Sequence, residues 1–331
     1  MFSTKIPVKW LRYLLIFEVE GPILWFGRDR GSQFKGLLAK WMRSQFECEP
    51  TFPCKKCSKS QEKPYCDFPL IFEPQIHGSE KTPSWLILPP LNRRNVLLKG
   101  ERISVEIRTF GELASHELFI KRFLPSMELG MMIKGIGNWI EKGVAPYGRI
   151  LLLFVHIWQK NGWLKIYDRE KRLIEKDFLP LTEIEAKLPQ QANSWKIDFI
   201  TPVCLTKDGN SILSPSFADV VEASFRRIYY LLNERREEFS KWGEKSIEMA
   251  KSVETISSNF HIHEIRSKRM VMDGFKKDKI YVSGELVVKK IPDELFPLLF
   301  AGGLTHIGKG VSQGYGGFVI RGETAEISQG D

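Results

Sequence analysis

The element order strand–helix–strand–strand–helix–strand occurs twice along the chain, and this predicts an α+β protein with two tandem ferredoxin-like domains. A length of 331 residues suits two domains of ordinary size. The stretch between residues 159 and 194 is polar, weakly patterned and interrupted by Pro180 and Pro189. We therefore expect a first domain over residues 1–190 and a second domain over residues 195–331.

Apolar runs predict the strands of the first domain, and an apolar stripe at helical spacing predicts its first helix. That stripe contains Phe34, Leu38 and Trp41. The expected elements, in order, are strand Trp10–Val19, helix Ser32–Phe46, strands Pro83–Pro90 and Arg102–Phe110, helix Leu113–Met132 and strand Arg149–Gln159.

The same order is expected in the second domain. Its first helix opens with a capping-box pattern from Ser216 to Asp219. The expected elements are strand Trp195–Thr206, helix Ser216–Trp242, a hairpin of Arg266–Asp273 with Ile280–Lys289, helix Pro292–Ala301 and strand Gly317–Arg321.

The chain carries a net charge of +9, which favours an anionic partner, most often a nucleic acid and less often an acidic membrane surface. Its longest apolar run, Ile150–Val155, is too short to cross a bilayer. Charged residues break up the N-terminal segment, where a secretory signal needs an apolar core. These features predict a cytoplasmic protein without a membrane partner.

The predicted first helix has a basic face that contains Lys35, Lys40 and Arg43. Gly36 lies one turn before Lys40, so the two residues face the same side of the helix. Glycine weakens a helix, and its presence on this face favours the close approach of a ligand. The alternative is a basic face that is merely solvated.

Four of the five cysteines cluster after this helix, whereas Cys204 stands alone. In a cytoplasmic chain such clustering favours a metal over disulfides. The Cys54-x-x-Cys57 pair can clip one tetrahedral ion, and Cys48 and Cys66 can complete a four-thiolate shell. We expect a structural zinc ion, less favourably an iron–sulfur cluster, and no cofactor for catalysis. Four thiols without metal are the alternative.

The predicted second-domain hairpin is strongly basic. A two-stranded ribbon with this charge can follow a phosphate backbone, although an exposed edge that resists aggregation would look similar. The residues concerned are Arg266, Lys268, Arg269, Lys276 and Lys277.

A glycine-rich segment, Gly302 to Phe318, lies near the end of the chain, and seven of its residues are glycine. Glycine permits positive φ angles and close approach, and successive free N–H groups suit phosphate oxygens. The predicted order helix–loop–strand is the reverse of a nucleotide-binding loop and better suits an extended polyanion. A flexible connector is the alternative. The candidate ligand-binding residues are Gly308, Lys309, Gly310, Gln313, Gly314 and Gly316.

Four stretches follow one another in a characteristic order. They are GSQFKGLLAKWMRSQFEC (31–48) with the cysteine segment and PYCDFPLIFEP (64–74), FITPVCL (199–205), IRSKRMVMDGF (265–275) and THIGKGVSQGYGGF (305–318). Together they resemble the CRISPR-associated precursor-RNA endoribonucleases of the RAMP superfamily, the family of CRISPR-associated protein six. The cysteine insert after the first helix matches one branch of that family, and the resemblance covers nearly the whole chain.

This resemblance implies two ferredoxin-like domains of the RNA-recognition type with a basic cleft between them. It also implies metal-independent cleavage of CRISPR repeat RNA, in which the 2′-hydroxyl attacks the adjacent phosphate. The products would be a 2′,3′-cyclic phosphate and a 5′-hydroxyl end, and the mature crRNA would stay bound in some members. Such chemistry needs an acceptor for the 2′ proton, a donor to the leaving oxygen and positive charge at the phosphate.

The chain departs from the family in its first helix, where Lys40 occupies the place in which the branch often carries a histidine. An ammonium group stabilises a phosphate but is a poor base. Two options therefore stay open: Lys40 acts electrostatically with a neighbouring basic residue, or a histidine elsewhere transfers the proton. We name Lys40 as the first catalytic candidate and His306, inside the glycine-rich segment, as the second. The match of that segment to the family suggests a structural or binding role for His306 just as readily. His261 and His263 are further options.

Two rival functions remain open. The nearer one is a RAMP protein that binds crRNA without cutting it, as a subunit of a CRISPR interference complex. It remains possible because Lys40 stands in place of the histidine. The more distant one is a zinc-stabilised RNA-modifying enzyme whose glycine-rich segment holds a small cofactor. The reversed element order around that segment argues against the second rival.

Overall fold

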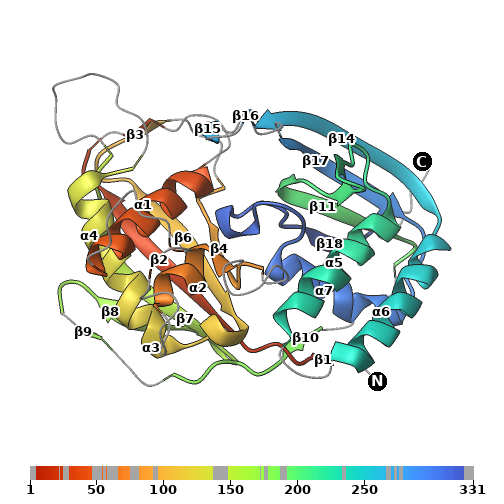
Figure 1. Cartoon of the computed structure of the whole chain (residues 1–331), viewed down its shortest axis with the longest axis horizontal. Coiled ribbons are helices and arrows are strands. Elements are labelled where there is room, and N and C mark those ends of the chain that lie inside the picture. Colours follow the sequence, from red (N-terminus) through yellow and green to blue (C-terminus); the bar gives the residue numbers. More distant parts are fainter. Residues whose placement is uncertain are drawn as a thin grey trace, which may run out of the picture. The chain divides into compact units, whose positions relative to one another are not determined.

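A computed structural model gives the fold of the chain (Figure 1). It describes residues 5–21, 23–24, 30–46, 54, 57, 66–74, 82–91, 96–136, 148–171, 173–174, 178–186, 192–232, 236–265, 270–271, 274–275 and 279–323. The chain forms two compact units. The first unit comprises Lys9–Thr182 and Ser312–Gly314, and the second comprises Met1–Val8, Glu183–Val311 and Tyr315–Asp331. Met1–Val8 thus belongs to the second unit although it precedes the first unit in the sequence. Ser312–Gly314 belongs to the first unit although it lies within the sequence of the second.

The first unit contains the predicted order of elements around an antiparallel sheet. The sheet order is β4-β6-β2-β7-β8-β9, so its first four strands have the ferredoxin-like arrangement. The main elements are β2 (Trp10–Val19), α1 (Arg30–Gln45), β4 (Trp85–Leu88), β6 (Arg102–Phe110), α3 (His116–Leu118), η5 (Phe119–Phe123), α4 (Leu124–Lys134) and β7 (Ile150–Gln159). Short elements are β3 (Ile23–Leu24), α2 (Asp67–Phe72), β5 (Val96–Leu97) and η4 (Gly111–Leu113).

The core of the first unit lies between the sheet and the helices on one of its faces (Figure 1). Alternate residues of β2 point into it, as the sequence pattern predicts. Tyr13 stacks on Phe119 with ring centroids 3.6 Å apart. Gly130 of α4 allows close contact with α1, because a β-carbon there would lie 2.4 Å from the indole of Trp41.

The sheet of the first unit extends beyond the predicted strands. β8 (Gly162–Asp168) pairs with β7, and β9 (Leu173–Ile174) pairs with β8. The sequence predicts only a polar domain boundary in this stretch. β8 lies near the sheet edge and leaves Leu164 and Lys165 exposed, so its sequence shows no clear apolar alternation.

The second unit repeats the arrangement with the sheet order β14-β17-β11-β18. Its main elements are β11 (Ser194–Val203), α5 (Phe217–Leu231), α6 (Arg236–Lys251), β14 (Thr255–Ile265), β17 (Lys279–Val288), α7 (Phe296–Thr305) and β18 (Val319–Glu323). The short elements are β1 (Lys5–Ile6), β10 (Ile184–Glu185), β12 (Thr206–Lys207), β13 (Asn210–Ser211), β15 (Met270–Val271), β16 (Gly274–Phe275), η6 (Asp293–Leu295) and η7 (Val311–Gln313), the last of which spans the change between units. Ser216 and Asp219 form the predicted capping box.

Three elements of the second unit differ from the predicted bounds. The first strand of the hairpin lies earlier in the chain, at Thr255–Ile265, and most of its residues are exposed on both faces, so no apolar periodicity marks it. The predicted helix Ser216–Trp242 is two helices, α5 and α6. Helix α7 continues past Gly302 to Thr305, because Gly302 serves packing rather than termination: a β-carbon there would lie 2.2 Å from Ser224 Oγ of α5.

Within the described part of the chain, no helix combines the length and apolar character needed to cross a membrane.

Candidate RNA-binding and catalytic site

Helix α1 holds the predicted basic residues. Phe34, Leu38 and Met42 are buried at helical spacing and fix which face of the helix meets the core. Lys40 and Gly36 are consequently exposed, whereas Lys35 and Arg43 are half-buried. Lys40 therefore lies on the face of α1 that is turned away from the core.

A short piece of the glycine-rich segment, Ser312–Gly314, packs on α1 and β4 within the first unit, and we call it the docked segment. Lys35 Nζ donates a hydrogen bond of 2.6 Å to Ser312 Oγ. The Gln313 carbonyl oxygen lies 1.7 Å from where a β-carbon on Gly31 would stand. A β-carbon on Gly314, which has φ +83°, would lie 2.4 Å from the carbonyl oxygen of Ile87. The two glycines therefore permit a contact that any other residue would obstruct.

Arg30 begins α1 and is buried, with 7% of its surface exposed. Its Nη1 donates to the carbonyl oxygen of Pro90 at 3.1 Å. Burial lowers the pKa of Arg30, but a guanidinium stays protonated in proteins. Arg30 and Ser312 are residues that the sequence analysis does not single out, since an arginine in a turn and a serine in a loop carry no distinctive pattern.

The rest of the glycine-rich segment is held in place within the second unit. Lys309 N donates to the carbonyl oxygen of Cys204 at 2.9 Å, and Gly316 N donates to that of Pro202 at 2.9 Å. Gly308 and Lys309 are exposed and form its accessible tip. Gly308, Gly310, Gly314 and Gly316 all have positive φ angles, as the glycine count predicts. These contacts describe a packed loop rather than a flexible connector.

His306 follows α7 and is fully buried. Its backbone has φ 58° and ψ 157°, a strained combination that non-glycine residues rarely adopt, at the position that ends the helix. Its Nδ1 lies 3.1 Å from the carbonyl oxygen of Tyr315, which can only accept a hydrogen bond. This environment favours a role in shaping the loop, which the sequence analysis keeps open beside catalysis.

Arg43 faces the cysteine insert. Its Nη2 lies 3.1 Å from Glu73 Oε1 and 3.9 Å from Cys54 Sγ, and its guanidinium lies 4.8 Å above the ring of Phe68. These contacts favour a structural role for Arg43. Lys35 remains a candidate for RNA binding, and Lys40 remains a candidate for catalysis.

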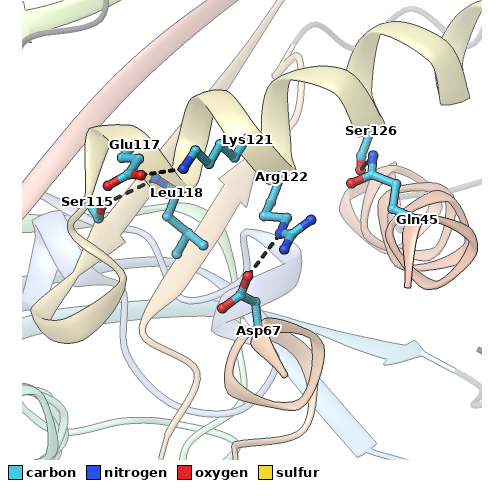
Figure 2. Close-up of polar contacts among 8 residues, drawn as sticks. All are labelled: Gln45, Asp67, Ser115, Glu117, Leu118, Lys121, Arg122 and Ser126. Carbon is cyan, nitrogen blue, oxygen red and sulfur yellow. Dashed lines mark hydrogen bonds and ion pairs between the residues drawn. The ribbon is translucent and has the colours of Figure 1, made fainter. Parts of the chain in front are cut away.

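The elements on either side of the cysteine segment, α1 and α2, are attached to the other helices of the first unit. Arg122 Nε donates to Asp67 Oδ2 at 2.9 Å, which ties α2 to η5, and Gln45 Nε2 donates to Ser126 Oγ at 3.0 Å, which ties α1 to α4 (Figure 2). Cys57 N donates to the carbonyl oxygen of Cys54 at 3.0 Å, so these two residues form a turn. Cys48 lies outside the described residues, and among those described no three metal-binding side chains gather into a cluster.

The basic hairpin residues Arg266, Lys268, Arg269, Lys276 and Lys277 also lie outside the described residues. The strands that lead to them are described. His263 of β14 shares a hydrogen bond of 2.6 Å with Ser283 of β17, and His261 is exposed on the same strand.

Two models of protein families match separate parts of the chain. The model described as CRISPR-associated endoribonuclease Cas6 matches residues 197–318, and a second model, described as an N-terminal domain, matches residues 8–178. The second part of the chain is thus similar to the Cas6 family. The Cas6 match includes the β14–β17 hairpin, His306 and the whole exposed tip of the glycine-rich segment, whereas α1 lies in the N-terminal match.

Solved structures agree with this fold. Cas6 of Thermus thermophilus is 12% identical with a TM-score of 0.50, and the match covers 95% of this chain and 99% of that one. A chain of a partial Cas6-RT-Cas1–Cas2 complex is 9% identical with a TM-score of 0.54, covering 96% of this chain and 47% of that one. A search of curated sequences gives no match. At these identities the likeness establishes the Cas6 fold, with its two ferredoxin-like domains, and leaves the individual site residues to be argued from their chemistry.

Proposed function

We propose that this chain cuts CRISPR repeat RNA without a metal ion, through attack of the 2′-hydroxyl on the adjacent phosphate. The observation that carries the proposal is the docking of Ser312–Gly314 on α1, which joins the glycine-rich segment of the family match to the basic helix. Two sequence features that independently predict phosphate binding thereby meet in one folded unit.

We assign the main electrostatic role to Lys40. Its exposed ammonium group can offset the charge that develops on the crowded phosphate and can donate a proton to the leaving 5′ oxygen. In this proposal Lys35, the exposed Lys309, the glycines of the loop and the basic hairpin residues bind the RNA backbone. The basic cleft expected between the two domains stays a prediction.

The test is cleavage of a labelled repeat RNA in excess EDTA, beside the same RNA with a 2′-deoxy group at the cleavage site. Cutting of the first RNA alone, with a 2′,3′-cyclic phosphate end, supports the proposal. Cutting of the deoxy RNA, or loss of cutting in EDTA, contradicts it. Gel filtration after the reaction then determines whether the product stays bound, which the proposal also includes.

A second function, crRNA binding without cleavage, is favoured by one observation. Helix α1 carries Lys40 rather than a histidine, and His306 is buried, so neither predicted candidate offers an exposed imidazole. Tight binding of repeat RNA with no cutting would select this function. In either case we propose CRISPR repeat RNA as the partner and other CRISPR proteins as further partners, because two of the similar chains come from Cas6-RT-Cas1–Cas2 complexes.

We also propose that the cysteine insert holds a structural zinc ion, with an iron–sulfur cluster as the less favoured group. Cys54 and Cys57 lie in one turn, as the two cysteines of a C-x-x-C metal clip do, and Arg43 Nη2 lies 3.9 Å from Cys54 Sγ. Cys66 directly precedes α2, which is anchored through Asp67. Cys48 supplies the fourth thiolate in this proposal.

A further inference from the structure

The side chain of Ser312 is buried and forms a specific hydrogen bond. It is 3% exposed, and its hydroxyl accepts the hydrogen bond from Lys35 Nζ at 2.6 Å. A lysine side chain is flexible, so a hydrogen bond from a buried, fixed group restricts where its ammonium lies. Lys35 is half-buried and keeps part of its surface in solvent.

The position of Ser312 is itself fixed by its neighbours. On its C-terminal side, Gln313 and Gly314 each make a contact too close for a β-carbon, one with Gly31 and the other with the backbone of Ile87. Ser312 therefore cannot move relative to α1 without breaking these contacts. The hydroxyl acts as a fixed support for the ammonium group.

Gly36, next to Lys35, provides an independent observation. It is exposed, its φ angle is not positive, and no described atom lies within 4 Å of where its β-carbon would stand. Glycine in the middle of a helix costs stability, and nothing in the described structure requires it here. By contrast, Gly31 of the same helix is required by the carbonyl oxygen of Gln313.

We propose that Lys35 and Gly36 contact one RNA backbone phosphate, and that Ser312 is the positioning residue that holds Lys35 for this contact. The absence of a side chain at Gly36 lets the sugar–phosphate backbone approach the helix, and the ammonium of Lys35 neutralises the phosphate charge. This inference rests on the proposed RNA binding of the chain and does not require that the RNA be cut.

The test is binding of a repeat RNA with a 2′-deoxy group at the cleavage site, measured over a series of salt concentrations. Lys35→Ala should reduce the salt slope by about 0.7, the share of one phosphate contact on a single strand. Ser312→Ala should weaken binding roughly two- to tenfold, and Ser312→Thr, which keeps the hydroxyl, should restore it. Adding Ser312→Ala to Lys35→Ala should weaken binding no further.

Gly36→Ala distinguishes an RNA-binding role of Gly36 from a purely structural one, because the two roles predict different changes in RNA binding and in stability. It should weaken RNA binding while raising the melting temperature of the free protein. Ser44→Ala and Lys121→Ala are matched controls, because Ser44 is an exposed serine of α1 bonded to Trp41 O and Lys121 is an exposed lysine of the same unit paired with Glu117. Both controls should bind RNA like the wild type.

An unchanged salt slope in Lys35→Ala overturns the inference, as does an equal effect of Ser312→Ala with and without Lys35. If Ser312→Ala does not fold, Lys35→Gln and Gly36→Ala decide by the same criteria. Wild-type protein that binds repeat RNA but never cuts it contradicts the cleavage proposal alone. Wild-type protein that binds no repeat RNA overturns both.

Discussion

The carbonyl oxygen of Gln313 lies 1.7 Å from the point at which a β-carbon of Gly31 would stand. The neighbour is backbone and cannot rotate away, so Gly31→Ala must displace either the docked segment or the start of α1. We expect a loss of about 1–3 kcal/mol of unfolding free energy, as for other overpacking substitutions. Chemical unfolding of the purified protein measures it.

Gly36→Ala is the matched control in the same helix. Because its β-carbon enters open space, the substitution should stabilise the protein by about 0.5–1 kcal/mol. Equal effects of the two substitutions would contradict the assigned position of the docked segment.

His306 and Lys40 should respond differently to substitution. His306→Gly adopts a positive φ angle without a steric penalty, so it should retain more stability than His306→Ala. Lys40→Ala should lower the cleavage rate on the order of 10²-fold without changing the melting temperature, as expected for a group that stabilises transition-state charge. The measurement is single-turnover cleavage beside thermal unfolding. A folded His306→Gly variant that loses cleavage as strongly as Lys40→Ala would support a catalytic role for His306.

Glu106 predicts an acid-dependent stability of the first unit. Burial alone would raise its pKa, but Arg108 and Arg12 outweigh this effect, so the pKa lies below its usual 4.5. Arg12 bonds both carboxylate oxygens, at 2.8 and 2.7 Å, and Arg108 also donates to Oε1. Since the unfolded chain takes up the proton first, the stabilisation is complete above pH 4.5 and is lost as the pH falls through the folded value.

Glu106→Gln should therefore cost about 3–5 kcal/mol at neutral pH, because it leaves the buried Arg108 and the half-buried Arg12 without their carboxylate. The difference from the wild type should shrink as the pH falls below 4.5. Glu117→Gln, which changes an exposed ion pair with Lys121 (Figure 2), should have little effect at any pH. A difference for Glu106→Gln that stays constant with pH would contradict the lowered pKa.

The proposed zinc ion should be present at about one per chain in freshly purified protein. Cys54→Ser and Cys57→Ser should lose the metal and lower the melting temperature, whereas Cys204→Ser, a buried cysteine of the second unit, should keep the metal. Elemental analysis of the three variants beside the wild type decides this. Wild-type protein without any bound metal would end the proposal.

Strands with a clear apolar pattern are predictable from the sequence. β2 and β6 lie at the predicted residues, Trp10–Val19 and Arg102–Phe110, because β2 is an apolar run bounded by charge and apolar residues alternate along β6. β14 is not predictable in the same way, since an edge strand exposed on both faces has no reason to alternate. Spatial context, rather than composition, decides such an element.

The site shows the same division. The basic face of α1 and the positive φ angles of the glycines follow from local pattern. The bond between Lys35 and Ser312 joins residues 277 positions apart, and no local signal marks either as the partner of the other. His306 illustrates the converse: a histidine inside a glycine-rich loop looks accessible in the sequence, but the closely packed backbone around it buries the ring.

The assignment of chain segments to the two units has a consequence for folding during translation. The docked segment belongs to the first unit, although nearly all of that unit precedes Glu183 in the chain. During translation, α1 and β4 emerge from the ribosome long before Ser312, so Gly31 and Ile87 lack their contacts with the docked segment until residues 312–314 have been made. A chain that stops short of Ser312 lacks the hydroxyl that holds Lys35, and the finished surface of α1 therefore marks a polypeptide whose synthesis has passed that point.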